Sequence, residues 1–159
     1  MISSGLQCVL FANDLTKPSS LTSIIKSLES LKLDIGILVN NVGMLGPHWM
    51  PFTEMDEKVV NDIISVNMTC GTMLCHALLP EMVRKGRGAI INISSSCSAF
   101  PVPYLATYAA TKHFIAAFTK AIAAENSNRF VLVNAYNINL AKRTFVNFSD
   151  QLQFLFRNL

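Results

Sequence analysis

Short apolar runs alternate along the chain with longer segments whose apolar residues recur every three or four positions. The short runs end at polar residues, as buried strands of a parallel sheet do, and they cover Gln7–Ala12, Ile35–Val39, Gly88–Ile93 and Phe130–Asn134. The longer segments predict helices over about 16–31, 56–85 and 105–124. Strands that alternate with helices predict an α/β fold, a parallel sheet with helices on both faces.

Composition limits the classes of function. The 159 residues suit a single domain, 1–159, and with 51% hydrophobic and 14% charged residues they can bury a core. The net charge of +3 is dispersed, and the one basic run, 84–87, follows a predicted helix, so we expect no nucleic-acid partner. No apolar run reaches 18 residues and the first residues do not form a signal peptide, so the chain as written is expected to be soluble.

The cysteines do not indicate a metal site. The four of them lack a CxxC pair and lack histidines at ligand spacing: Cys8, Cys70, Cys75 and Cys97. We interpret them as buried free thiols in a reducing compartment. No metal cofactor is expected.

Polar residues gather where the predicted strands end. Asp14 follows the first apolar run, 40–43 follows the second, and Ser94 and Ser95 close the third. Ligands of parallel α/β sheets bind beyond the carboxyl ends of the strands, so these residues are candidates for one binding site.

Tyr108 and Lys112 lie four positions apart on the helix that begins one loop after Ser95. Residues at this spacing share a helix face, so the phenol and the ammonium are expected to point into one cleft. A nearby cation favours the phenolate, and we therefore expect Lys112 to lower the pKa of Tyr108. Such a phenol can act as a general acid or base.

Together these residues resemble the short-chain dehydrogenase/reductase family. Asn40-Asn41-Val42-Gly43 is similar to its NNAG turn, Asn67 to its mid-helix asparagine, Ser95 to its catalytic serine, and Tyr108 with Lys112 to its YxxxK motif. The resemblance covers about residues 6–135, leaving a divergent tail at 136–159. Within the family, the chain is most similar to the group of 17-beta-hydroxysteroid dehydrogenase type 3 and the type 12 very-long-chain 3-oxoacyl-CoA reductases.

The resemblance implies a role for each residue. Tyr108 would exchange a proton with the substrate oxygen, and Lys112 would lower the phenol's pKa and hold the nicotinamide ribose. Ser95 would bind the substrate carbonyl, although Ser94 or Ser96 could be the reacting hydroxyl instead. Asn67 would anchor a water linked to Lys112, and Asp14 would contact the adenine. The implied cofactor is NADP or NAD, with NADPH favoured, and its expected binding residues are Asp14, Asn40, Asn41, Gly43, Tyr108 and Lys112.

Two parts of the family pattern are missing from these 159 residues. We find neither its first two strands nor the Gly-rich turn that holds the pyrophosphate, so the expected fold is an incomplete Rossmann-like doubly wound sheet. Gln7–Ala12 would fit the third strand of the family, either paired directly with Ile35–Val39 or left loose. We expect the chain to be a fragment, an alternative product or an incomplete gene model of a longer reductase.

Two functions follow from the resemblance. The first is an NAD(P)-dependent oxidoreductase that reduces a ketosteroid or a 3-oxoacyl-CoA, or oxidises the matching alcohol. The second is a catalytically incompetent remnant that acts as a binding or dimerisation module. A homodimer through the helices at about 56–85 and 105–124 is consistent with both, and the resemblance implies the endoplasmic reticulum.

Overall fold

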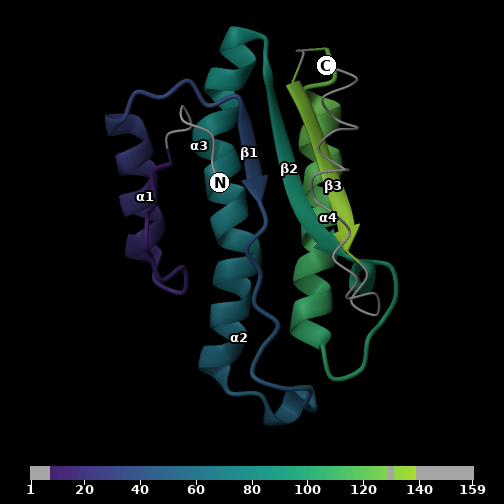
Figure 1. The fold of residues 1–159 in the computed structure, drawn as a ribbon. Coiled ribbons are helices and arrows are strands. Elements are labelled where there is room, and N and C mark those ends of the chain that lie inside the picture. The colour runs from purple at the N-terminus through teal and green to yellow at the C-terminus, as the bar shows by residue number, and fades with distance from the viewer. Residues whose placement is uncertain (1–7, 129–130, 139–159) are drawn as a thin grey trace, which may run out of the picture.

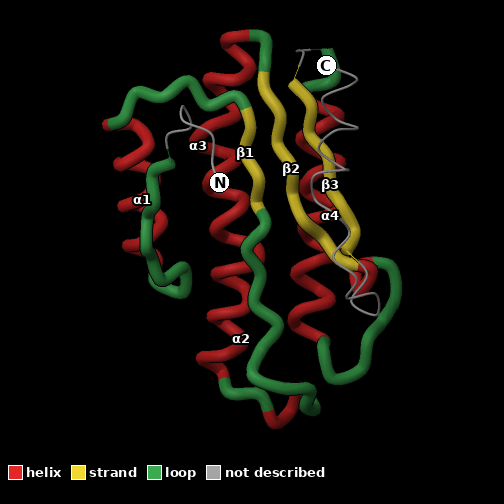
Figure 2. Tube along the Cα trace, viewed as in Figure 1, coloured by secondary structure: helices red, strands yellow, loops and turns green. Residues whose placement is uncertain are grey.

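The chain folds into a three-stranded parallel sheet with helices (Figure 1). The computed structural model describes residues 8–128 and the backbone of residues 131–138. The elements, in order, are α1 (Pro18–Ser30), β1 (Ile37–Asn40), α2 (Glu57–Ile64), α3 (Cys70–Lys85), β2 (Gly88–Ser95), α4 (Ala106–Glu125) and β3 (Val131–Ile138) (Figure 2). The predicted helices and three of the four predicted strands are thereby confirmed.

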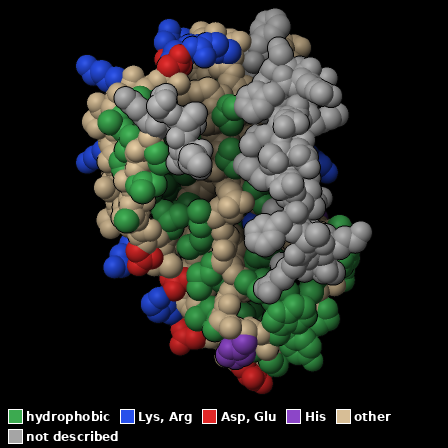
Figure 3. Space-filling model, in the orientation of Figure 1, with side chains coloured by type: hydrophobic (Ala, Val, Ile, Leu, Met, Phe, Trp, Pro, Cys, Tyr) green, Lys and Arg blue, Asp and Glu red, His purple; other side chains and the backbone are tan. Residues whose placement is uncertain are grey.

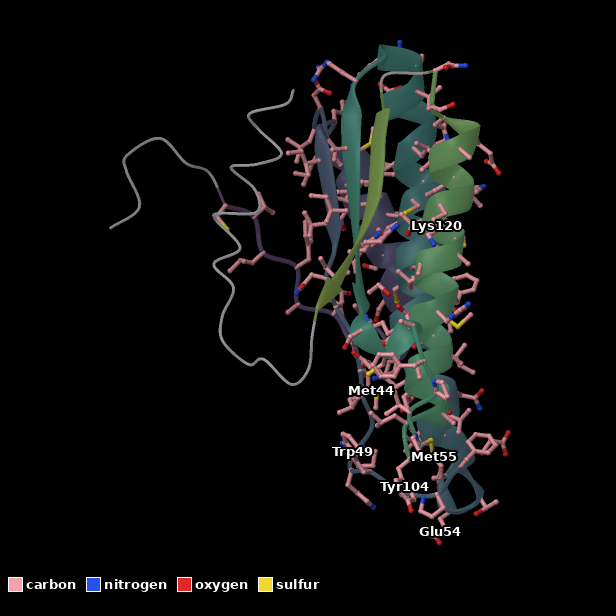
Figure 4. The ribbon with its side chains drawn as sticks, turned by 90° about the vertical axis from the view of Figure 1, so that its right-hand side faces the viewer. Met44, Trp49, Glu54, Met55, Tyr104 and Lys120 are labelled. Carbon is pink, nitrogen blue, oxygen red and sulfur yellow. The ribbon has the colours of Figure 1, made fainter. Side chains whose placement is uncertain are left out.

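The sheet order is β1-β2-β3, with Ile37 opposite Ala89 and Gly88 opposite Val131. Both crossovers step in the same direction, and since such crossovers are right-handed, their helices must lie on the same face. Figure 4 shows α2, α3 and α4 together on one side of the sheet. The described residues thus form one half of a doubly wound sheet, with helices on one face, because helices reach the second face only where the strand order reverses.

One long helical stretch runs from Glu57 to Lys85 and contains a π-helical turn, Ser65–Thr69, between α2 and α3. The Asp56 carboxylate accepts a hydrogen bond from the backbone N–H of Lys58 and caps the first turn. Gly86, with a left-handed φ of 64°, ends the last turn. In length and composition the stretch could cross a membrane, with a window of mean hydropathy 1.4 of which 28% is buried, and Cys75 and Met82 of the stretch pack against Ile90 of β2.

The core lies between β2 and the two helices behind it. Ile90 is fully buried and packs with Cys75 and Met82 of α3, and Phe118 and Ile122 of α4 complete the cluster. This packing fixes β2 against α3 and α4, so the carboxyl end of β2 and the first turns of α4 meet at one end of the molecule.

The first predicted strand does not form. Gln7 lies outside the described residues, and Cys8–Ala12 has no regular secondary structure and no strand pairing. Leu10 is 88% exposed, and Val9 is 56% exposed. The second edge of β1 carries no described strand, so the segment is not paired with β1. The segment could have paired with Ile35–Val39 or been left loose, and the structure shows the loose arrangement.

Charged side chains gather at the amino end of the sheet (Figure 3). Asp34 is paired there with Lys85 and Arg87, and Glu81 is paired with Arg84 and Lys85. Hydrogen bonds from Arg84 and Lys85 lower the pKa of Glu81 to about 2. These ion pairs are exposed and lie at the end of the sheet opposite the predicted site.

The expectation of four buried thiols needs one correction, because Cys8 is exposed while Cys70, Cys75 and Cys97 are buried. A thiol reagent such as Ellman's reagent should therefore modify one cysteine rapidly in the native chain and the other three only on unfolding. Cys8→Ser should abolish the rapid phase. Two or more rapid equivalents would contradict the described packing.

Candidate active site

Tyr108 and Lys112 lie on the buried face of α4, with only 9% and 4% of their surfaces exposed. The Lys112 ammonium is 5.8 Å from the centre of the Tyr108 ring, so the shared helix face predicted from the sequence is confirmed. The same ammonium donates a hydrogen bond to the carbonyl oxygen of Ile93 at 2.8 Å. The lysine is thus tied to β2 as well as facing the tyrosine.

Ser95 is the serine that reaches Tyr108. Its side chain is hydrogen-bonded to the phenol, and its Oγ also accepts the backbone N–H of Cys97 at 3.3 Å, which begins the short 3-10 helix Ser96–Ser98. Ser94 instead donates its hydroxyl hydrogen to the carbonyl oxygen of Lys112 at 2.9 Å. Of the alternatives left open by the sequence, the geometry favours Ser95 over Ser94.

The electrostatics of the pair differ from the expectation. Burial raises the pKa of Tyr108, and the hydrogen bond from Ser95 opposes that rise without overcoming it. Burial lowers the pKa of Lys112. The expected lowering of the phenol's pKa by Lys112 is therefore wrong, because desolvation is the largest effect on the phenol and the ammonium lies beside the ring, bonded to Ile93.

Asn67 lies in the π-helical turn and joins three segments. Its Oδ1 accepts the backbone N–H of Met44 at 2.7 Å, and its Nδ2 donates to the Met44 carbonyl oxygen at 2.9 Å and to Thr111 Oγ1 at 3.0 Å. Thr111 in turn donates to the carbonyl oxygen of Tyr108 at 2.7 Å. Asn67 therefore fixes the loop after β1 against the helix of the tyrosine. Thr111 was not predicted, and its position between Tyr108 and Lys112 is the only signal in the sequence.

Asn40, the last residue of β1, makes its side-chain hydrogen bonds within the protein. The Asn40 side chain donates to Asn92 Oδ1 at 2.8 Å and to the Gly71 carbonyl oxygen at 3.4 Å, so it holds β1 to β2 and α3. Asn92 extends this buried chain to Thr119 Oγ1 at 2.9 Å. The Asn40 side chain, which was predicted to bind the cofactor, is thus engaged in hydrogen bonds within the protein.

Gly43 lies against Lys112. A Cβ atom at position 43 would come within 3.3 Å of Lys112 Nζ and 3.7 Å of Asn67 Oδ1. A side chain here would displace the ammonium, and glycine allows the loop to close over it. Asn41 and Gly43 thus remain candidates for a close backbone approach to a ligand.

Asp14 lies apart from the buried group. Its exposed carboxylate accepts hydrogen bonds from the backbone and hydroxyl of Thr16, which lower its pKa, and pairs with Lys17 at 3.6 Å. The neighbouring Leu15 carbonyl oxygen accepts a hydrogen bond from Ser65 at 3.2 Å. A role of Asp14 at the adenine stays a prediction.

A small cavity connects these segments. It has a volume of about 90 Å³ and is lined by residues from the loop before α1, the turn after β1, the π-helical turn and α4, among them Leu15, Asn41, Val42, Asn67 and Lys112. No cluster of metal-ligating side chains occurs in the part of the chain that the structure describes. Asn41, Asn67 and Lys112 are thus brought together, and Tyr108 lies beside Lys112 and is bonded to Ser95.

Comparison with known proteins identifies the family. Residues 2–150 match the model of the short chain dehydrogenases. The chain belongs to this family. It is similar to inactive hydroxysteroid dehydrogenase-like protein 1 of Pongo abelii, with 40% identity over 67% of this chain and 33% of that protein. It is also 41% identical to the very-long-chain 3-oxoacyl-CoA reductase of Laccaria bicolor over 67% of this chain and 31% of that protein.

A third relative, 17-beta-hydroxysteroid dehydrogenase type 3 of Danio rerio, is 32% identical over 83% of this chain and 43% of that protein. The predicted family and its subgroup are thus confirmed. The chain spans about a third of the length of the first two relatives, and less than half of the third.

Solved structures confirm the partial Rossmann-like fold. A short-chain dehydrogenase from Sphingobium yanoikuyae in complex with NADPH has a TM-score of 0.73 and 31% identity, over 80% of this chain and 49% of that one. The bulky-bulky ketone specific alcohol dehydrogenase from Comamonas testosteroni has a TM-score of 0.74 and 27% identity, over 81% of this chain and 50% of that one.

The buried ammonium gives a prediction about pH and stability. Because burial lowers the pKa of Lys112, folding is opposed by its charge at neutral pH, and this opposition fades as pH rises toward the ordinary lysine pKa of 10.5. Lys112→Met should therefore increase the urea midpoint at pH 7, with a smaller gain at pH 10. The exposed Lys120 (Figure 4) supplies the control, Lys120→Met, which should change neither value. An unchanged midpoint in Lys112→Met would contradict this account.

Proposed function

We propose that the chain provides the proton-transfer half of a carbonyl reductase of this family, with Tyr108 as general acid. The observation that carries the proposal is the Tyr108 phenol, hydrogen-bonded to Ser95 and buried beside Lys112. A phenol, a hydroxyl and an ammonium in one enclosed site can protonate an oxygen and stabilise its developing charge.

The proton is well placed for reduction. A raised pKa keeps the Tyr108 hydroxyl protonated at neutral pH, and the protonated form is the one that can transfer a proton to a carbonyl oxygen. Ser95 would donate a second hydrogen bond to that oxygen as it gains negative charge. In the oxidation of an alcohol the same phenol would have to lose its proton first, so we propose reduction as the main direction.

A nicotinamide cofactor fits one end of the site. Lys112 makes one described hydrogen bond to a protein carbonyl, and Gly43 leaves the space next to its ammonium free of a side chain. We propose that Lys112 holds a ribose hydroxyl there, with Asn41 and Gly43 beside it, and that the cofactor, NADPH in preference to NADH, supplies the hydride. A binding site for the cofactor's pyrophosphate is not recognised, since these 159 residues contain no Gly-rich turn before a helix.

The substrate is proposed to be a ketosteroid or a 3-oxoacyl-CoA. The names of two relatives support both classes, and both present a ketone on a large apolar body. The surroundings of the phenol are correspondingly apolar, because Leu45 and Val102 pack against the cluster that contains Tyr108. The endoplasmic reticulum is proposed as the location on the resemblance alone.

Titration of the 159-residue chain with NADPH, followed by nicotinamide fluorescence, tests the cofactor. We expect weak binding, millimolar or worse, because the pyrophosphate has no preformed site. At saturating NADPH, slow reduction of a 3-oxoacyl-CoA should fall by roughly 100-fold or more in Tyr108→Phe. Exposed Tyr104 supplies the control, Tyr104→Phe, which should retain the rate. Reduction that survives Tyr108→Phe, or bound NADPH without any reduction, would overturn the proposal.

A second function has support of its own, a non-catalytic module that assembles through its helices. The relative from Pongo abelii is named an inactive protein. The stretch Glu57–Lys85 also leaves apolar side chains at the surface, with Ile64 38% and Met73 41% exposed, and only 28% of its most apolar window buried. We propose that this face pairs two copies of the chain.

Sedimentation equilibrium tests this pairing. Met73→Glu places a charge on the proposed face, and we expect it to weaken a dimer by tenfold or more, because the charge would have to be desolvated. Thr22→Glu adds the same charge to exposed α1 and should leave assembly unchanged. A monomer at all concentrations, or a dimer insensitive to Met73→Glu, would contradict the proposed face.

A further inference from the structure

Three hydrogen bonds hold the segment around Ser95, and two of them tie it to α4. Ser94 Oγ donates to the carbonyl oxygen of Lys112 at 2.9 Å. Nδ1 of His113 lies 2.8 Å from the carbonyl oxygen of Ser98, and Ser98 Oγ donates to the carbonyl oxygen of Ser95 at 2.7 Å. Because a carbonyl oxygen only accepts, the His113 nitrogen must carry the hydrogen.

Two of these bonds reach consecutive residues of α4, because Ser94 is bonded to Lys112 and Ser98 is bonded to His113. Ser94 and Ser95 adjoin in the chain, as do Lys112 and His113. Ser95 therefore lies between one bond that holds its preceding residue and another that holds the 3-10 helix Ser96–Ser98 after it. Cys97 of that helix packs directly on Tyr108.

We propose that Ser94 and His113 are positioning residues, which hold the strand end and the 3-10 helix against α4 so that the Ser95 hydroxyl stays on the Tyr108 phenol. Neither lines the cavity described above, and neither touches the phenol in any described contact. Their effect must therefore pass through Ser95. The proposal rests on the proposed function for its catalytic meaning, whereas the geometry it explains is present without cofactor or substrate.

The two residues differ in their surroundings. Ser94 is 2% exposed, so its bond is shielded from water. His113 is an exposed residue of α4, so its bond to Ser98 is only partly buried. The larger effect is therefore expected from Ser94 and the smaller one from His113.

The experiment monitors the Tyr108 phenol by NMR. In protein labelled with [13Cζ]tyrosine, three resonances are expected, and Tyr108→Phe assigns the one of interest. Ser95→Ala gives the reference, because it removes the bond from Ser95: the Tyr108 resonance should shift, and the pKa of Tyr108 should rise. Circular dichroism checks that each variant remains folded.

Ser94→Ala and His113→Ala should each move the Tyr108 resonance in the direction of Ser95→Ala, by a smaller amount. In the Ser95→Ala background neither should add a further shift, since the route through Ser95 is gone. His113→Asn, which keeps a side-chain N–H, should restore part of the His113→Ala effect, and His76→Ala, at an exposed histidine of α3, should have none.

Two results would overturn the proposal: an unmoved Tyr108 resonance in both single variants, or shifts that persist at full size in the Ser95→Ala background. If Ser94→Ala does not fold, the His113 series alone decides between these outcomes. The measurement needs neither NADPH nor ketone, so a failure here is distinct from a failure of the proposed reductase.

Discussion

The side chain of Asn67 is the interaction on which the site depends. A π-helical turn interrupts the long helix at this point, and such turns place a side chain where regular α-helical geometry would not. From there Asn67 binds both backbone groups of Met44 and the hydroxyl of Thr111. The loop after β1, the helix between the strands and the helix of Tyr108 are thus joined by one amide, and Gly43 is brought against Lys112 as a consequence.

Burial decides the chemistry of the tyrosine and lysine. Both side chains are removed from water, which raises the pKa of the phenol and lowers that of the ammonium. Each group is thereby driven toward its neutral form, an arrangement that costs stability and that isolated surface residues would not show. A neutral phenol beside Ser95 suits the protonation of a carbonyl oxygen. A bound ligand that hydrogen-bonds Lys112 would favour its charged form again.

The relatives are consistent with both proposed functions. One is named a reductase of 3-oxoacyl-CoA, and another is named inactive, at nearly the same identity and over the same share of this chain. The residues shared by such proteins therefore cannot decide activity alone. What differs physically is the hold on the cofactor, since catalytic groups act only on a substrate and hydride donor held in position. The phenol, hydroxyl and ammonium are assembled here, whereas a preformed pyrophosphate site is not found among the described residues.

The sequence by itself determined the helices, the strands β1 to β3, the family and the candidate site residues, because periodicity and motif spacing are local properties of the chain. It could not decide whether Cys8–Ala12 forms a strand, since a strand requires a neighbour. Nor could it choose Ser95 over Ser94, foresee Thr111 and His113, or give the direction in which the pKa of Tyr108 shifts. Those depend on burial and on contacts between residues distant in the chain, which only the packing of α4 against β2 and the π-helical turn decides.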